Sequence, residues 1–159
     1  MIAPGTTGTQ APSDHELIAA AFHKADAICP FGPSFFLGHL ARFVRDQCPD
    51  PGERLPVVRL FLTDGEVLDL CHIIGIASRW VMLAVRDPGG PHDRMSVDLV
   101  PFELIRRVQI SIQPAEGASI GFAQAHPPAV ITPESLVRDA MTPPSVGASP
   151  TGPSATPVP

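Results

Sequence analysis

The fold is decided by residues 55–68, which read Leu-Pro-Val-Val-Arg-Leu-Phe-Leu-Thr-Asp-Gly-Glu-Val-Leu. Before the turn, the apolar side chains of Val58, Leu60 and Leu62 recur at every second position, which is the period of a strand with one buried face. Asp64-Gly65 then has the composition of a tight two-residue hairpin turn, in which both central residues need positive φ. The stretch therefore predicts two antiparallel strands joined by a short turn.

Further stretches of the same character follow this hairpin. They are rich in β-branched and aromatic residues, and Pro-Gly-rich loops separate them. The five strand-like stretches lie at 55–63, 66–76, 80–86, 95–100 and 104–112. Five short antiparallel strands predict a mainly β fold over residues 53–113, a small antiparallel β-barrel of the Sm-like or SH3-like kind, with helices preceding it.

The last of these stretches contains an irregularity. Val108, Ile110 and Ile112 share one face, and counting back by two places Arg106 on that face too. Burying an unpaired charge is costly, so the phase is expected to shift between Ile105 and Arg107. A β-bulge at this point would shift it and would bend the strand.

Two helices are predicted ahead of the strands, within residues 13–52. Ser13 and Glu16 have the spacing of a capping box, and the helix that they start is expected to end near Ala27. A second helix is expected over Phe35–Gln47, with Ser34 as its cap.

The two ends of the chain differ from the rest in composition. The chain has 20 prolines, half of them after Ile112. Residues 1–12 are expected to be a disordered tail, and residues 114–159 a Pro-rich linker and tail. One short helix is expected near 133–141, because Thr132-Pro133-Glu134 supplies a cap, a proline at the first helical position and an acid near the helix dipole.

Charge and hydropathy narrow the classes of function. The net charge is −5, and between Arg54 and Arg107 there are seven arginines and seven acidic residues, so the strands carry no basic excess. No apolar run is long enough to span a membrane, and residues 1–12 lack the features of a secretory signal. The three cysteines show no metal-ligand spacing, which favours reduced thiols and a cytoplasmic location.

Catalytic signatures are missing from the sequence. The six histidines are scattered, and no pair has the i, i+4 spacing of a helical metal site. Cys29 or Cys71 could pair with a histidine as a nucleophile, but no spacing supports it. Gly89-Gly90 lies between strands rather than before a helix, so it does not indicate a phosphate loop. We expect no catalytic residue, no cofactor and no metal.

Residues 55–68 resemble the first motif of the Sm-like family, found in the bacterial RNA chaperone Hfq and in Sm and LSm proteins. Residues 80–83 resemble the third strand of that motif, and residues 100–108 its short turn and last strand. The resemblance implies an oligomer in which strand four of one copy pairs with strand five of the next. Residues 99–105 also resemble the end of a PRC-barrel, a domain that usually docks onto partners.

The chain departs from the Sm-like family where that family binds RNA. The family bends its second strand at a glycine, where this chain has Leu70. The family's uridine site uses a polar or aromatic residue in the loop after strand two, which here reads Gly75-Ile76-Ala77-Ser78-Arg79. Its second site carries Lys-His or Arg-Gly, where this chain has Pro101-Phe102-Glu103.

Two hypotheses for function follow. The first is a non-catalytic accessory or scaffold protein that self-assembles or docks in a larger complex; its oligomer edge would be the weakly charged fourth strand, with Met95, Val97 and Leu99. The second is an RNA-binding regulator that uses aromatic stacking and phosphate contacts. The candidate RNA or partner contacts are Arg79, Trp80, Phe102, Arg106 and Arg107. Alternatively, the aromatic residues pack the barrel or a subunit contact, and the arginines pair with Asp98 or Glu103.

Overall fold

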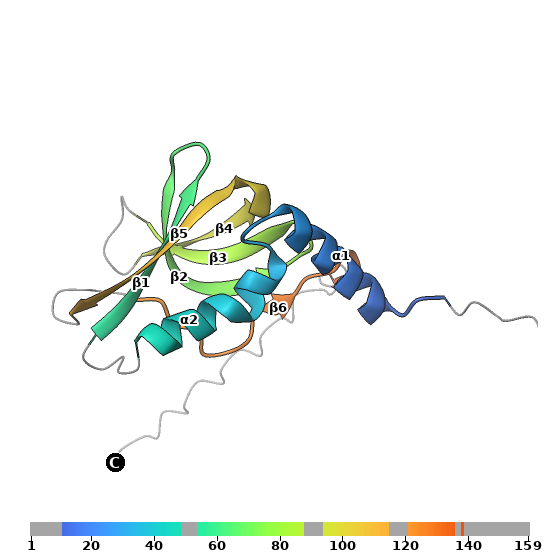
Figure 1. The fold of residues 1–159 in the computed structure, drawn as a ribbon, viewed down its shortest axis with the longest axis horizontal. Helices are drawn as coiled ribbons and strands as arrows, with labels where there is room; N and C mark the ends of the chain where they lie inside the picture. The colour runs from blue at the N-terminus through green and yellow to red at the C-terminus, as the bar shows by residue number, and fades with distance from the viewer. Residues whose placement is uncertain (1–10, 49–53, 88–93, 115–120, 136–137, 139–159) are drawn as a thin grey trace, which may run out of the picture.

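The computed structural model describes residues 11–48, 54–87, 94–114, 121–135 and 138. A bent, mainly antiparallel sheet is accompanied by helices from the N-terminal part of the chain, with α2 along the lower side of the view and α1 extending away from the strands (Figure 1). The helical elements are α1 (Asp14–Ile28), the π-helical η1 (Phe35–His39), α2 (Leu40–Gln47) and the 3₁₀ turn η2 (Phe102–Leu104). The strands are β1 (Arg54–Leu62), β2 (Val67–Ile76), β3 (Trp80–Arg86), β4 (Met95–Pro101), β5 (Ile105–Pro114) and β6 (Ala129–Val130).

The sheet confirms the predicted class and corrects its details. Its strand order is β4-β3-β2-β1-β5 with antiparallel neighbours, and the short β6 adds a parallel pairing to β2. Among the described residues β4 and β5 do not pair with each other, so the sheet is open rather than closed. The expected five-stranded barrel is therefore confirmed only as a mainly antiparallel sheet with N-terminal helices.

The β1–β2 turn is a hairpin of a different type from the one predicted. Gly65 has a φ of 95°, and no non-glycine residue of the described part has positive φ, so only one central residue is left-handed. Leu62 N–H donates to the Glu66 carbonyl at 2.9 Å, which closes a three-residue loop. A three-residue loop of this kind is a type I turn followed by a left-handed glycine. Asp64 stabilises it by accepting the Glu66 N–H at 3.0 Å.

The predicted bulge in the last strand is present. Phe61 pairs with Arg107 and Leu62 with Ile105, so Arg106 has no counterpart on β1. Arg106 and Arg107 are both exposed, while Ile105 is buried. The extra residue keeps the charge out of the core, for the physical reason that predicted it.

Strand β2 bends without the glycine that the Sm-like family uses. Its pairing with β3 shifts between Leu70 and His72 and again between Ile73 and Gly75, so Cys71 and Ile74 are extra residues. Leu70 itself is 3% exposed and belongs to the core. Two bulges thus provide the curvature, since each adds local twist and bend.

Helix α1 begins as predicted but packs lightly. Ser13 accepts the Glu16 N–H while the Glu16 carboxylate accepts the Ser13 N–H at 2.7 Å, which completes the capping box. The hydrogen bonds from Ser13 lower the pKa of the Glu16 carboxyl. Phe22 is the one buried residue of α1, whereas Leu17 and Ile28 are 54% and 73% exposed. The helix therefore leaves apolar surface uncovered.

The second predicted helix is split into η1 and α2. Ser34 does not cap it with its side chain, contrary to expectation; its hydroxyl donates to Asp26 Oδ2 at 2.5 Å and its N–H donates to Asp26 Oδ1 at 3.1 Å. These bonds hold the end of α1 against the start of η1. Phe36 and Leu40 then enter the core, where the Phe36 ring lies 5.9 Å from that of Phe102.

The segment after β5 was expected to be a linker, but its described part packs on the sheet. Residues 121–131, here called the strap, bond to β2 beyond its pairing with β1. Phe122 also bonds to β1 and is 5% exposed. A helical turn begins at Pro133, and Thr132 accepts the Ser135 N–H as its cap. Residues 1–10 of the predicted N-terminal tail, the end of the predicted helix and the predicted Pro-rich tail after it lie outside the described residues. Within the described part, no helix is long and apolar enough to cross a membrane.

Candidate functional site

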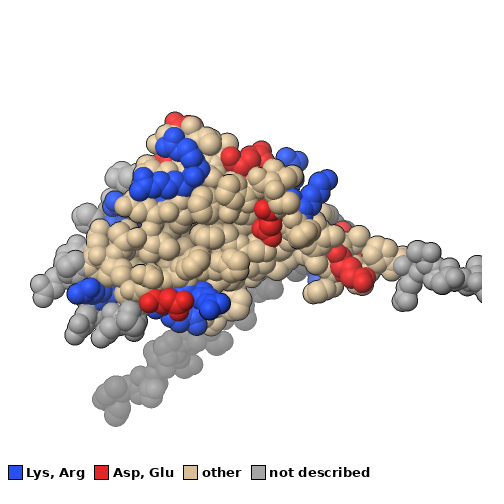
Figure 2. Space-filling model, in the orientation of Figure 1, with Lys and Arg blue, Asp and Glu red and all other residues tan. Residues whose placement is uncertain are grey.

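The outer edge of β4 carries a row of uncovered apolar side chains. Met95, Val97 and Leu99 are 50%, 55% and 57% exposed, although large apolar residues of the neighbouring β3 are buried. In the space-filling view, charged residues lie mainly around the rim of the visible face, and a broad uncharged area covers its middle, over β3, β4 and β5 (Figure 2). The row is the predicted oligomer edge, and its side chains are accessible.

Hydrogen bonds at both ends of β4 show which of its backbone groups point away from β3. Asp87 N–H donates to the Arg94 carbonyl at 3.2 Å, and Phe102 N–H donates to the Arg79 carbonyl at 3.1 Å, both in the register of the β3–β4 ladder. Bonded and non-bonded pairs alternate along an antiparallel ladder, so the even-numbered residues of β4 bond to β3. The backbone groups that point to the free edge belong to Met95, Val97 and Leu99.

The same reasoning identifies the free edge of β5. Leu62 N–H donates to β2, so the alternate residues of β1 bond to β5, where they oppose residues 107, 109 and 111. The backbone groups that point away from β1 belong to Val108, Ile110 and Ile112. The side chains of Val108 and Ile110 are half-buried, and that of Ile112 is more exposed, at 36%. Both edges, which no described strand of this chain covers, thus combine outward backbone groups with apolar side chains.

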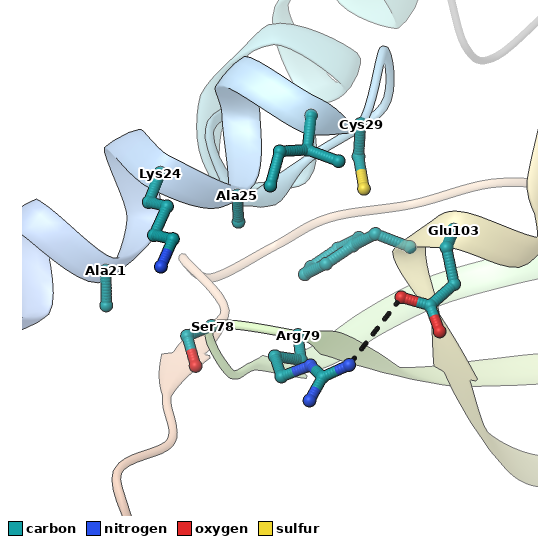
Figure 3. A pocket seen from close by; sticks show the side chains of 9 residues that line it. Ala21, Lys24, Ala25, Cys29, Ser78, Arg79 and Glu103 are labelled. Atoms are coloured by element: carbon teal, nitrogen blue, oxygen red, sulfur yellow. Dashed lines mark ion pairs between the residues drawn. The ribbon is translucent and has the colours of Figure 1, made fainter.

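A pocket of about 380 Å³ lies between α1, the β2–β3 loop and η2. Lys24 and Cys29 come from the helix wall, Ser78 and Arg79 from the loop below it, and Glu103 from η2 (Figure 3). The Arg79 guanidinium lies 4.0 Å from the Glu103 carboxylate, and both side chains are mostly exposed. The exposed ion pair is weak, so the pocket offers two cations, Lys24 and Arg79, against one acid.

The structure separates the five predicted RNA or partner contacts. Arg79 and Phe102 line the same pocket, but Phe102 is 2% exposed and is held in the core, so it is not an open stacking surface. Trp80 is half-buried at the start of β3. Arg106 lies on the β5 bulge, and the Arg107 guanidinium lies over the Phe61 ring at 4.9 Å from its centroid.

Sequence reasoning missed Lys24, Cys29 and Ser78 as pocket residues. Lys24 is the only lysine of the chain, yet nothing in its spacing indicates that α1 faces the β2–β3 loop. The bonds between Asp26 and Ser34 join the end of α1 to the start of η1, and the spacing of Lys24 gives no sign of them. The β5 edge was expected only from the Sm-like resemblance, and its residues Val108, Ile110 and Ile112 were not among the candidate contact residues.

Other reactive groups form no cluster in the described part of the chain. No three His, Cys, Asp or Glu side chains there are placed to hold a metal ion. Burial raises the pKa of the Cys71 thiol, which lowers the fraction of reactive thiolate.

Comparison with known proteins assigns no family. No protein-family model, no curated protein and no solved structure matches this chain. The Sm-like resemblance of residues 53–113 therefore remains an expectation from the sequence.

Proposed function

We propose that this protein is a non-catalytic accessory or scaffold subunit that assembles with copies of itself, β4 of one copy pairing with β5 of the next. The observation that carries the proposal is the coincidence on both free edges: the residues whose N–H and C=O groups point outward are the ones with apolar side chains. An unpaired strand edge is a template for another strand.

The two edges fit each other in detail. In an antiparallel pair, directly opposed hydrogen-bonded residues place their side chains on one face. With Val97 opposite Ile110 of the second copy, the whole apolar row of β4 meets the whole apolar row of β5, and Asp98 lies opposite Gln109. Three such pairs would make about six backbone hydrogen bonds.

A head-to-tail contact also explains why the sheet is open. The β4 strand of each copy would cover the β5 edge of one neighbour, and its own β5 edge would be covered by β4 of another neighbour. The same contact therefore repeats from copy to copy. Such repetition generates a ring where the rotation closes and a filament where it does not. The Sm-like resemblance favours the ring.

Mass in solution tests the proposal. The full chain, sedimented over a range of micromolar concentrations, is expected to run as a discrete oligomer with a mass that falls on dilution. A chain that remains monomeric across the range would contradict the proposal.

A second candidate function, RNA binding, is favoured by one observation. The two loops that bind RNA in the Sm-like family, after strand two and between strands four and five, meet here in the pocket that contains Lys24 and Arg79. Two cations can contact a phosphate of single-stranded RNA, and this contribution is strongly salt-dependent. The even balance of charge on the strands makes this the second candidate.

Titration of labelled oligo-U and oligo-A at low salt tests RNA binding. Arg79→Ala is expected to weaken binding several-fold, and added salt should weaken it further. Arg42→Ala is the matched control, because Arg42 is equally exposed and forms a comparable surface ion pair with Asp46. No binding at low salt, or equal losses in both variants, would contradict RNA recognition at this pocket.

A further inference from the structure

The strap fills a slot that opens where β2 bends away from β1. On one side of the slot, Phe122 N–H donates to the Pro56 carbonyl of β1 at 2.7 Å. On the other side, Ala123 N–H donates to the Cys71 carbonyl of β2 at 2.9 Å, and Ile131 N–H donates to the Ile76 carbonyl at 2.7 Å. The strap thus bonds to backbone carbonyls of both strands beyond the point where β1 and β2 pair with each other.

The side-chain amide of Gln124 bonds to β2 in the way that the backbone of a neighbouring strand would. Its Oε1 accepts the Ile73 N–H at 2.8 Å, and its Nε2 donates to the Ile73 carbonyl at 3.0 Å. Nε2 also donates to the His126 carbonyl at 2.7 Å, which folds the strap around the amide. Only a side chain that both accepts and donates can match Ile73 in this way, so the slot selects an amide at this position.

Few side chains anchor the strap. Phe122 and Pro128 are buried, while most residues between them are exposed. Gly75 leaves room for Ile131, since a Cβ there would lie 2.5 Å from Ile131 Cδ1. Residues 121–133 contain no Asp, Glu, Lys or Arg.

We propose that the slot is a peptide-binding site, filled in this structure by the strap, and that it accepts an extended, uncharged segment of another protein with the same pattern. That pattern is an aromatic residue, a glutamine two positions later and a proline four positions after the glutamine. Main-chain bonds to a strand supply affinity in such sites, and pockets for particular side chains supply specificity. A segment of another protein can make both contributions, because neither requires the covalent connection between the strap and β5.

The strap competes with any such segment. It follows β5 after only six residues, 115–120, so its effective concentration at the slot is high. An outside segment binds only the fraction of molecules whose slot is open, and its apparent affinity falls by that fraction. A change that weakens the strap must therefore strengthen binding of the outside segment.

The test uses the full chain and a fluorescent peptide with the sequence of residues 121–133. Gln124→Ala in the protein removes two bonds to Ile73, and we expect it to bind the peptide at least about tenfold more tightly than the unchanged protein. His126→Ala is the matched control, since only the backbone of His126 bonds to Gln124, and it should leave the affinity unchanged. A peptide with alanine in place of glutamine should bind more weakly to every variant.

Hydrogen exchange on the unchanged chain supplies a second readout that needs no variant. Excess peptide should remove protection from the Phe122 and Ala123 amides while the Ile73 amide stays protected. The proposal is overturned if the peptide changes no amide of the strap, if the Gln124→Ala and unchanged chains bind it equally, or if the alanine peptide binds as well as the original.

Discussion

Replacing Phe36 by alanine is expected to lower the free energy of unfolding by about 3–5 kcal/mol, the usual cost of removing a buried aromatic side chain. Phe36 is fully buried in η1 and packs edge-on against Phe35, with ring centroids 5.2 Å apart. Its ring also lies 5.9 Å from Phe102 in η2, so it joins the helical layer to the turn that precedes β5. Domains of this size are stable by only about 5–15 kcal/mol, so the loss is a large share of the total.

Urea denaturation followed by circular dichroism measures this loss, and Phe43 provides the matched control. Phe43 lies on α2 and is 51% exposed, so Phe43→Ala should cost less than about 1 kcal/mol. The double variant with Phe102→Ala should lose less than the sum of the single losses, because the two rings share one contact. Equal effects of the Phe36 and Phe43 variants would contradict the packing described.

The strands were predictable because their signals are local. Alternation in residues 55–63 and the Asp64-Gly65 pair identify the first hairpin without knowledge of the rest of the chain. The Arg106 bulge was predictable for another reason, the cost of a buried charge. The two bulges of β2 gave no such signal, since residues 70–74 include four apolar residues and moving one of them to the other face buries no charge.

The strap and the pocket were not predictable, because both depend on contacts between distant segments. Residues 121–131 lack strand periodicity, and Gln124 substitutes its amide for a backbone pair that no sequence pattern records. Phe102 was expected as a candidate contact because an aromatic residue on a short turn suits either stacking or packing. Its burial against Phe36 decides in favour of packing.

Val97→Lys is expected to weaken assembly at least about 100-fold, equivalent to roughly 3 kcal/mol. The variant removes an apolar side chain from the centre of the exposed row and places a charge where the second copy would exclude water. Val67→Lys is the matched control, because Val67 is 44% exposed on β2 and lies on neither free edge. Sedimentation should show monomers for the first variant and the original oligomer for the second.

A mixing experiment distinguishes β4–β5 pairing from a two-fold contact between two β4 strands. Ile112→Lys damages the β5 edge and leaves β4 intact, so in the head-to-tail arrangement each single variant is monomeric alone. Mixed together, they retain one good interface, formed by β4 of the Ile112→Lys chain and β5 of the Val97→Lys chain, and should yield dimers and nothing larger. If Ile112→Lys alone still dimerises, β4 pairs with itself and the head-to-tail arrangement is wrong. A mixture that stays monomeric while both variants remain folded also contradicts it, because an undamaged pair of edges would then have failed to associate.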